Sequence, residues 1–195
     1  MSVSRPFSHA IAEGDGISVV AAVEDADAAR AAEGQRAEAL VVNGDPARLR
    51  EATRLPILWR ANAAVDRAAE VADAVTVTLP DEDEDHDPAQ RRHEDALAVG
   101  LDCAVEVRTE EELERALEVL DPEILLLAPP QADEEERLEL VLELLAAVPA
   151  GKLAIADLTV TTEDEVHELE RAGVDAVIVH AADVSPLVGE APPEV

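Results

Sequence analysis

The sequence predicts a single α/β domain in which eight parallel strands alternate with helices and close into a compact (β/α)8 barrel, the TIM-barrel fold. Short apolar runs recur along the chain, which is typical of strands buried on both faces. The segments between them are rich in Ala and Glu and carry helix start and stop signals. The units are uniform and no glycine-rich turn follows the first run, so a closed barrel is favoured over an open doubly wound sheet.

Eight apolar runs mark the expected strands. Each is too short for a helix and almost uniformly apolar. In chain order they are Ile17–Val23, Ala39–Val42, Ile57–Trp59, Ala74–Leu79, Cys103–Val107, Ile124–Ala128, Leu153–Ala156 and Ala176–Val179.

The segments between these runs predict helices with defined ends. Thr109 and Thr162 each stand three residues before a glutamate, so a capping box is expected at the start of the helix that follows. Gly100 and Gly173 lie just past predicted helix ends, where a left-handed residue is needed. Leucines three and four residues apart within 110–120 give that helix one apolar stripe to lay on the sheet.

The two ends of the chain carry weaker signals. We expect residues 1–195 to form one domain, with 1–15 as a loose lead-in and 185–195 as a short tail that contains prolines. The last barrel helix is expected to be reduced or absent, because few residues follow the eighth run. The gap left in the wall would expose apolar surface that a second copy of the chain could cover, so a homo-oligomer stays open.

The charge of the chain excludes two classes of partner. It has 45 Asp and Glu against 15 Lys and Arg, a formal net charge of -30 and a pI near 4.2. Such a protein would be repelled by nucleic acid and by anionic membranes, so neither is expected as a partner. Lys152 is the one lysine, and we interpret so acidic and lysine-poor a chain as halophilic, since concentrated salt screens self-repulsion. A high-GC codon bias would also favour arginine over lysine.

Compartment and cofactor signals are sparse. Cys103 is the only cysteine, which excludes an internal disulfide and a cysteine-pair zinc site, and it is expected to be a small core residue. No apolar run approaches the roughly 18 residues of a membrane span, and the N-terminal stretch lacks the apolar core of a signal peptide. We therefore expect a soluble, cytoplasmic protein without a cofactor. Trp59 is expected between sheet and helix, and His86, His93 and His167 on exposed positions.

Two segments resemble the indole-3-glycerol-phosphate synthase family. Residues 100–117, GLDCAVEVRTEEELERAL, are similar to that family's fifth strand and fifth helix almost residue for residue. Residues 161–179, TTEDEVHELERAGVDAVIV, resemble its seventh helix and eighth strand, a stretch shared with other phosphate-binding barrels. Weaker similarity, including LPILWR over 55–60, extends over 17–185. The resemblance implies a barrel with its active site at the carboxyl ends of the strands.

The family closes an indole ring with loss of carbon dioxide and water, using a lysine general acid, a second lysine and a glutamate base. The resemblance places that glutamate on Glu106 and the general-acid lysine on Arg60, which keeps the charge but cannot give up a proton near neutral pH. Other family site positions have changed chemically, and they fall on Ala22 and Glu24, Ala128–Pro130, Asp157–Thr159 and His180–Ala182. Lys152 precedes the seventh strand, so it should emerge at the opposite, N-terminal face.

The expected mouth of the barrel collects carboxylates, from Glu24, Asp25, Glu106, Asp157 and Asp183. Arg60 is the obvious partner for a buried Glu106, as a structural ion pair or with Glu106 as a working base. Glu24, Glu106 and Asp157 with His180 could hold a divalent cation. Strand ends gather such groups in any acidic barrel, so no metal is predicted. A phosphate site is hard to build where acidic groups crowd and glycines are missing.

Three functions stay open. The favoured hypothesis is a divergent, shortened synthase-like barrel that has lost ring closure and whose role is unknown: a binding or interaction protein, or one of no identified activity, with a small molecule as the candidate ligand at its C-terminal face. The second is an active indole-3-glycerol-phosphate synthase, a carbon-carbon lyase of tryptophan biosynthesis. The third is a barrel enzyme with a new, metal-assisted or metal-free reaction around Glu106, Asp157 and His180.

Overall fold

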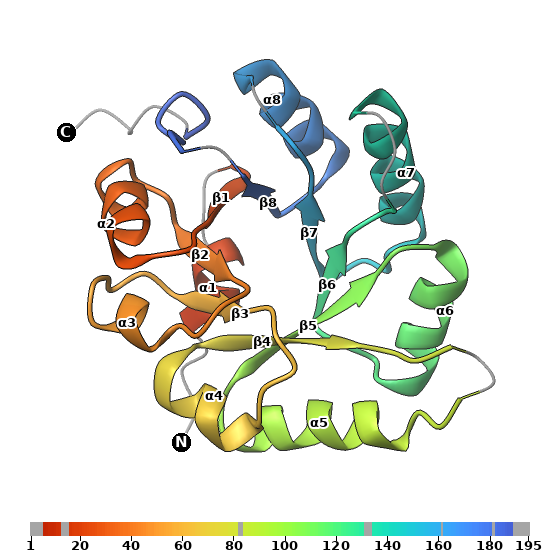
Figure 1. The fold of residues 1–195 in the computed structure, drawn as a ribbon. Coiled ribbons are helices and arrows are strands. Elements are labelled where there is room, and N and C mark those ends of the chain that lie inside the picture. Colours follow the sequence, from red (N-terminus) through yellow and green to blue (C-terminus); the bar gives the residue numbers. More distant parts are fainter. Residues whose placement is uncertain are drawn as a thin grey trace.

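The computed structural model describes residues 6–12, 16–81, 84–130, 134–160, 162–180 and 182–188. Eight parallel strands pair in chain order, and β8 pairs with β1, so the sheet closes into a barrel (Figure 1). The predicted (β/α)8 fold is confirmed, and every expected strand is present. The strands are β1 Ser18–Ala22, β2 Ala39–Val42, β3 Ile57–Trp59, β4 Ala74–Thr78, β5 Asp102–Val107, β6 Ile124–Leu127, β7 Leu153–Asp157 and β8 Ala176–Val179.

The helices surround the barrel, apart from the first (Figure 1). One helix follows each of β1 to β7, and α1 precedes β1. They are α1 Pro6–Ala12, α2 Ala26–Gly34, α3 Ala47–Arg50, α4 Val65–Val71, α5 Asp87–Ala98, α6 Glu110–Val119, α7 Glu134–Ala147 and α8 Glu163–Ala172. None of them, within the described residues, has the length and apolar character to cross a membrane.

Helix ends follow the sequence signals with one difference. Thr162 and Glu165 form the reciprocal capping box that was predicted. At α6 the Thr109 hydroxyl accepts from the Glu112 amide as expected, but the Glu112 carboxylate accepts the amide of Arg108 at 2.8 Å, so this box is only half formed. Gly100 and Gly173 adopt φ of 87° and 99°, the left-handed conformation expected past helix ends.

Apolar side chains fill two layers. Alternate strand residues point into the barrel or outward beneath the helices, as in β6, where Leu125 and Leu127 belong to the outer cluster and Ile124 and Leu126 to the inner one. Trp59 is buried in the outer layer, as expected. His93 differs from the expectation because it is only 7% exposed on α5, whose inner face it shares with buried alanines.

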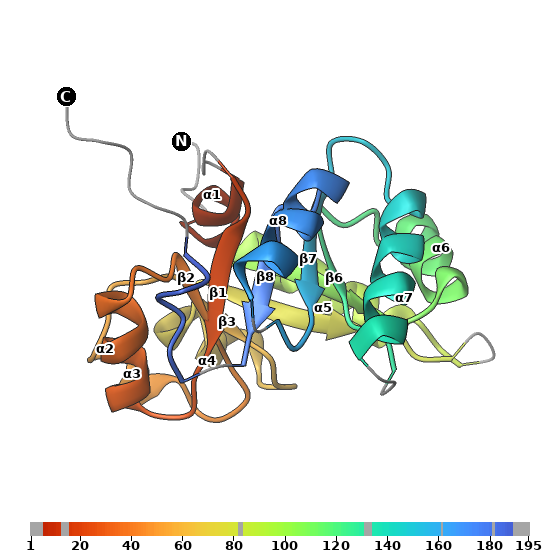
Figure 2. The same cartoon turned by 90° about the horizontal axis from the view of Figure 1, so that it is seen from above.

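Residues 6–12 are not a loose lead-in. Phe7 and Ile11 of α1 are buried in the inner cluster, and Figure 2 shows α1 at the end of the barrel where β1 begins. Interior alanines such as Ala39 and Ala74 leave room for them. The amide and hydroxyl of Ser8 also lie 2.8 and 3.1 Å from the buried carboxylate of Asp102. Helix α1 therefore forms a plug that closes the N-terminal end of the barrel. Residues 1–5 and 13–15 lie outside the described part of the chain.

No helix follows β8 within residues 182–188, which form a turn in the space between α2 and α8 (Figure 1). Val184 and Leu187 are buried there, and the Val184 amide donates to Gln35 Oε1 at 2.9 Å. Val99 is the only exposed large hydrophobic residue in the described ranges. Within the described residues, the apolar gap expected beside the missing helix is therefore filled by this turn. The rest of the predicted tail, 189–195, is not described.

Candidate functional site

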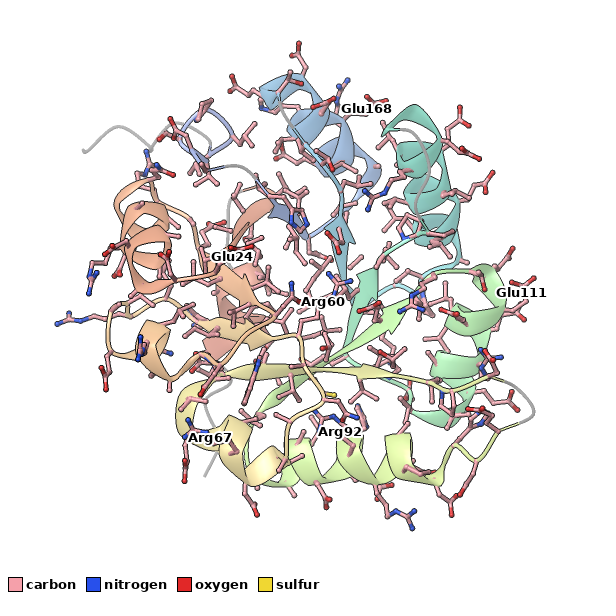
Figure 3. The ribbon with its side chains drawn as sticks, viewed as in Figure 1. Glu24, Arg60, Arg67, Arg92, Glu111 and Glu168 are labelled. Atoms are coloured by element: carbon pink, nitrogen blue, oxygen red, sulfur yellow. The ribbon has the colours of Figure 1, made fainter. Side chains whose placement is uncertain are left out.

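Four polar side chains from four strands meet at the carboxyl end of the barrel. Glu106 lies in β5 and Asp157 ends β7, while Arg60 and His180 come directly after β3 and β8. The residue two positions before each of them belongs to the inner cluster, so strand alternation turns all four toward the mouth. Figure 3 shows Arg60 at the centre of the barrel. All four were predicted from the sequence as candidate site residues, and the fold brings them together.

Arg60 bonds to two carboxylates from different strands. Its Nε donates to Glu106 Oε2 at 3.0 Å, which is the expected ion pair, and its Nη1 donates to Asp157 Oδ2 at 2.5 Å. The other oxygen of Glu106 accepts from Arg108 Nη2 at 2.9 Å, and the other oxygen of Asp157 lies 2.7 Å from His180 Nε2. All four carboxylate oxygens therefore have a partner.

Burial and charge act in opposite directions on this network. Burial would raise the pKa of Asp157, but the hydrogen bond to His180 and the charge of Arg60 together hold that pKa below its ordinary value. Burial would lower the pKa of the Arg60 guanidinium, but its bond to Glu106 and the charge of Asp157 outweigh this and raise it. Both groups are therefore ionised at neutral pH, and Arg60 cannot act as a proton donor.

Two further arginines reach the mouth. Arg108 follows β5, and Arg137 extends from α7 to donate its Nη2 to the backbone oxygen of Asp157 at 2.8 Å. Within the described residues, Arg60 Nη2, Arg108 Nη1 and Arg137 Nη1 make no hydrogen bond. A cavity of about 460 Å³ is lined by these three arginines, two carboxylates and His180. The mouth is therefore locally cationic in a chain of formal charge -30.

A second cavity, of about 720 Å³, adjoins the first toward α5. The two share Arg60, Glu106 and Arg108 in their linings. The second also has neutral polar groups, from Asn43, Asn62, Thr76 and Thr78, one more cation, Arg92, and two more acidic residues, Glu84 and Asp85. Arg92 donates to the backbone oxygens of Ala61 and Ala63 and so fixes the segment between β3 and α4.

Three of the five carboxylates expected in the mouth lie outside the linings of both cavities. Glu24 is exposed beyond the end of β1 and lines neither cavity (Figure 3). Asp25 caps α2 by accepting from the amides of Asp27 and Ala28, and Asp183 accepts from Ser185. Asp25 thus caps the start of a helix and Asp183 a turn, and of the five expected carboxylates Glu106 and Asp157 line the 460 Å³ cavity.

The donors do not converge as a metal site does. Arg60 stands between Glu106 and Asp157 and takes one oxygen of each. In the described ranges no group of three or more His, Cys, Asp and Glu side chains is placed to hold a metal ion. Arginine, not a metal ion, is thus the cation that joins the two carboxylates in the structure.

Sequence reasoning missed Arg108 and Arg137. Arg108 had a usable signal, because it follows the inward-facing Glu106 by two positions and the alternation of the strand carries it to the mouth. Arg137 had none, because a helix residue reaches the mouth only through tertiary packing. Lys152 was placed correctly: its Nζ lies 2.5 Å from Asp121 Oδ1, at the start of β7 and away from the mouth.

The fold and the site define a parallel barrel whose polar cavity lies at the carboxyl ends of its strands. A crystal structure provisionally assigned as a phosphonomutase, from Burkholderia cenocepacia, superposes with a TM-score of 0.62 over 90% of this chain and 91% of that one. The two are 19% identical in sequence, so this likeness concerns the fold alone.

Part of the chain is similar in sequence to enzymes that share one name. Indole-3-glycerol phosphate synthase of Polaromonas naphthalenivorans is 38% identical over 98 residues, which is 49% of this chain and 37% of the relative. The enzymes of the same name from Variovorax paradoxus and Shouchella clausii are 36% and 32% identical over 98 and 88 residues. The matched part therefore covers little more than a third of each relative's length. No protein-family model matches the chain.

Proposed function

We propose that this chain is an indole-3-glycerol-phosphate-synthase-like barrel that no longer closes the indole ring and instead binds a small anionic ligand in its mouth. The observation that carries the proposal is Arg60, fixed between Glu106 and Asp157 where the resemblance puts a general-acid lysine. A guanidinium with a raised pKa cannot supply the proton that ring closure needs. The partial match to named synthases supports the relationship, and it leaves the activity to be tested.

The anionic ligand follows from the guanidinium groups. Carboxylates and phosphates are the partners that arginine binds best, often through two nitrogens at once. Arg60, Arg108 and Arg137 each have a terminal nitrogen unused within the described residues, and all three line the 460 Å³ cavity. Because the rest of the protein is strongly acidic, an anion would be held here and repelled elsewhere. Glu106 and Arg60, the candidate catalytic residues of the inherited site, would then line the binding cavity as charged groups and take no part in proton transfer.

Loss of ring closure is tested directly. The purified chain is incubated with carboxyphenylamino deoxyribulose phosphate, at low and at molar salt, and formation of the indole product is followed by its fluorescence. The synthase from Shouchella clausii serves as the positive control. We expect no product. Turnover by this chain that disappears in a Glu106→Gln variant would overturn the proposal and favour an active synthase.

Anion binding is tested with inorganic phosphate and with citrate. Thermal unfolding is measured at constant ionic strength, with sodium chloride as the balancing salt, because an acidic protein is stabilised by any electrolyte. An anion at a hundred times its Kd stabilises by about 2.7 kcal/mol, which for a chain of this size raises Tm by about 5–10 °C.

The matched variants separate site binding from general screening. The shift should vanish in the double variant Arg108→Ala, Arg137→Ala. It should persist in Arg67→Ala, because Arg67 lies on the outside of α4 with ion pairs to Asp45 and Glu70 (Figure 3). Equal shifts in both variants would show that the mouth holds no anion.

A further inference from the structure

Neither carboxylate in the mouth is free to act as a base. Both oxygens of Glu106 accept from arginines, and both oxygens of Asp157 are bonded, to Arg60 and to His180. All four carboxylate oxygens are therefore already occupied by hydrogen-bond partners. Proton transfer would therefore fall to another group in the same cavity.

His180 is that group. Its Nε2 lies 2.7 Å from Asp157 Oδ1, and its ring lines the 460 Å³ cavity with 45% of the side chain exposed. In the neutral imidazole, the nitrogen that faces the ionised Asp157 carries the hydrogen, and Nδ1 has the lone pair. Nδ1 makes no hydrogen bond within the described residues. A carboxylate that orients an imidazole in this way is a common device for preparing a general base.

From this geometry we propose that His180 is a catalytic general base, oriented by Asp157, for a ligand that carries an anionic group and a carbon acid next to a carbonyl. This rests on the proposed anion site. The general base would then be His180, after β8, and not Glu106 of β5, where the resemblance puts it.

The step requires no other reactant. The C–H bond next to the carbonyl breaks, its proton goes to His180 Nδ1, and its electron pair moves onto the carbonyl oxygen to give an enolate. The unused guanidinium nitrogens of Arg60 and Arg137 line the same cavity and can stabilise that negative oxygen. Return of a proton, or of a deuteron from heavy water, to the carbon regenerates the base.

The probe is dihydroxyacetone phosphate, a small ketone with a phosphate group and hydrogens next to its carbonyl. It is incubated with the whole chain in heavy water, and loss of the carbon-bound hydrogen signal is followed by proton NMR. Binding of the probe is measured separately by isothermal titration. We expect the chain to accelerate exchange over buffer.

His180→Gln is the decisive variant, since glutamine can still face Asp157 but cannot take the proton. We expect it to bind the probe as the wild type does and to lose about 100-fold in exchange rate. His167→Gln, on the exposed face of α8, is the matched control and should exchange normally. His180→Asn is made in parallel, and thermal unfolding checks that each variant folds.

The outcomes separate the two proposals. Binding without exchange by the wild type overturns the role of His180 and leaves the anion site intact. The same role is overturned if His180→Gln exchanges at the wild-type rate, or if only Glu106→Gln abolishes exchange. Failure of the probe to bind overturns this inference, and the stabilisation by phosphate and citrate then decides separately whether the anion site stands.

Discussion

Replacing Arg60 by methionine should destabilise the barrel, because it leaves two buried carboxylates without their shared cation. The side chains of Glu106 and Asp157 are each 9% exposed, and that of Arg60 is 21% exposed. Removing one partner of a buried ion pair costs about 3–5 kcal/mol. Each carboxylate keeps a second partner, Arg108 or His180, so we expect the lower end, about 3 kcal/mol, which lowers Tm by about 6–12 °C.

The same substitution has a defined pH dependence. The pKa of Asp157 is lowered in the folded protein, so its contribution to stability is fully present above the unfolded pKa of about 3.9 and is lost as pH falls through the folded value. Arg60 causes part of that lowering. The cost of Arg60→Met should therefore be complete at neutral pH and should shrink below about pH 4, where the carboxylates of the variant become protonated.

Urea denaturation followed by circular dichroism measures both effects. Arg67→Met is the matched control, since Arg67 is 44% exposed and its ion pairs should contribute less than about 1 kcal/mol. If Arg60→Met changes the unfolding free energy no more than this control, or if its cost stays the same in acid, the Arg60 pairs are not what stabilises the mouth.

Three further predictions concern the fold. Phe7→Ala should cost about 3–5 kcal/mol by urea denaturation, because Phe7 is fully buried in the plug; a change below about 1 kcal/mol would mean that α1 is dispensable. The Cys103 thiol, whose pKa burial raises to about 12, should react with iodoacetamide only after unfolding, and fast labelling of the native protein would contradict its buried position. Gly173→Ala should cost roughly 1–2 kcal/mol because φ there is 99°, and a neutral result would argue against a left-handed end to α8.

The strands were predictable because their signal is local. A run such as Ala39–Val42 is apolar at every position only if both of its faces are buried, and this excludes an exposed strand or a surface helix. Caps were partly predictable for the same reason. Thr162 and Glu165 form their capping box from neighbours in sequence. The Glu112 carboxylate can reach the amide of Thr109 or that of Arg108, and in the structure it accepts from Arg108.

The plug and the charge of the mouth were not predictable, because both depend on contacts distant in sequence. Phe7 is one apolar residue in a short segment, and its own neighbours in sequence do not show that it is buried. The space that it fills inside the barrel is left by alanines of distant strands. The mouth was expected to be acidic because many carboxylates follow strand ends. Whether such a residue turns inward, as Asp157 does, or caps the next helix, as Asp25 does, differs by one step of strand alternation.

Arg60 also has a place in the order of folding. Its two carboxylate partners stand 46 and 97 positions away along the chain, on strands that do not neighbour β3. Both bonds can form only when β3, β5 and β7 already hold their final positions, and closure of such long loops is slow. We therefore expect the two Arg60 bonds to form late in folding, after these three strands have assembled.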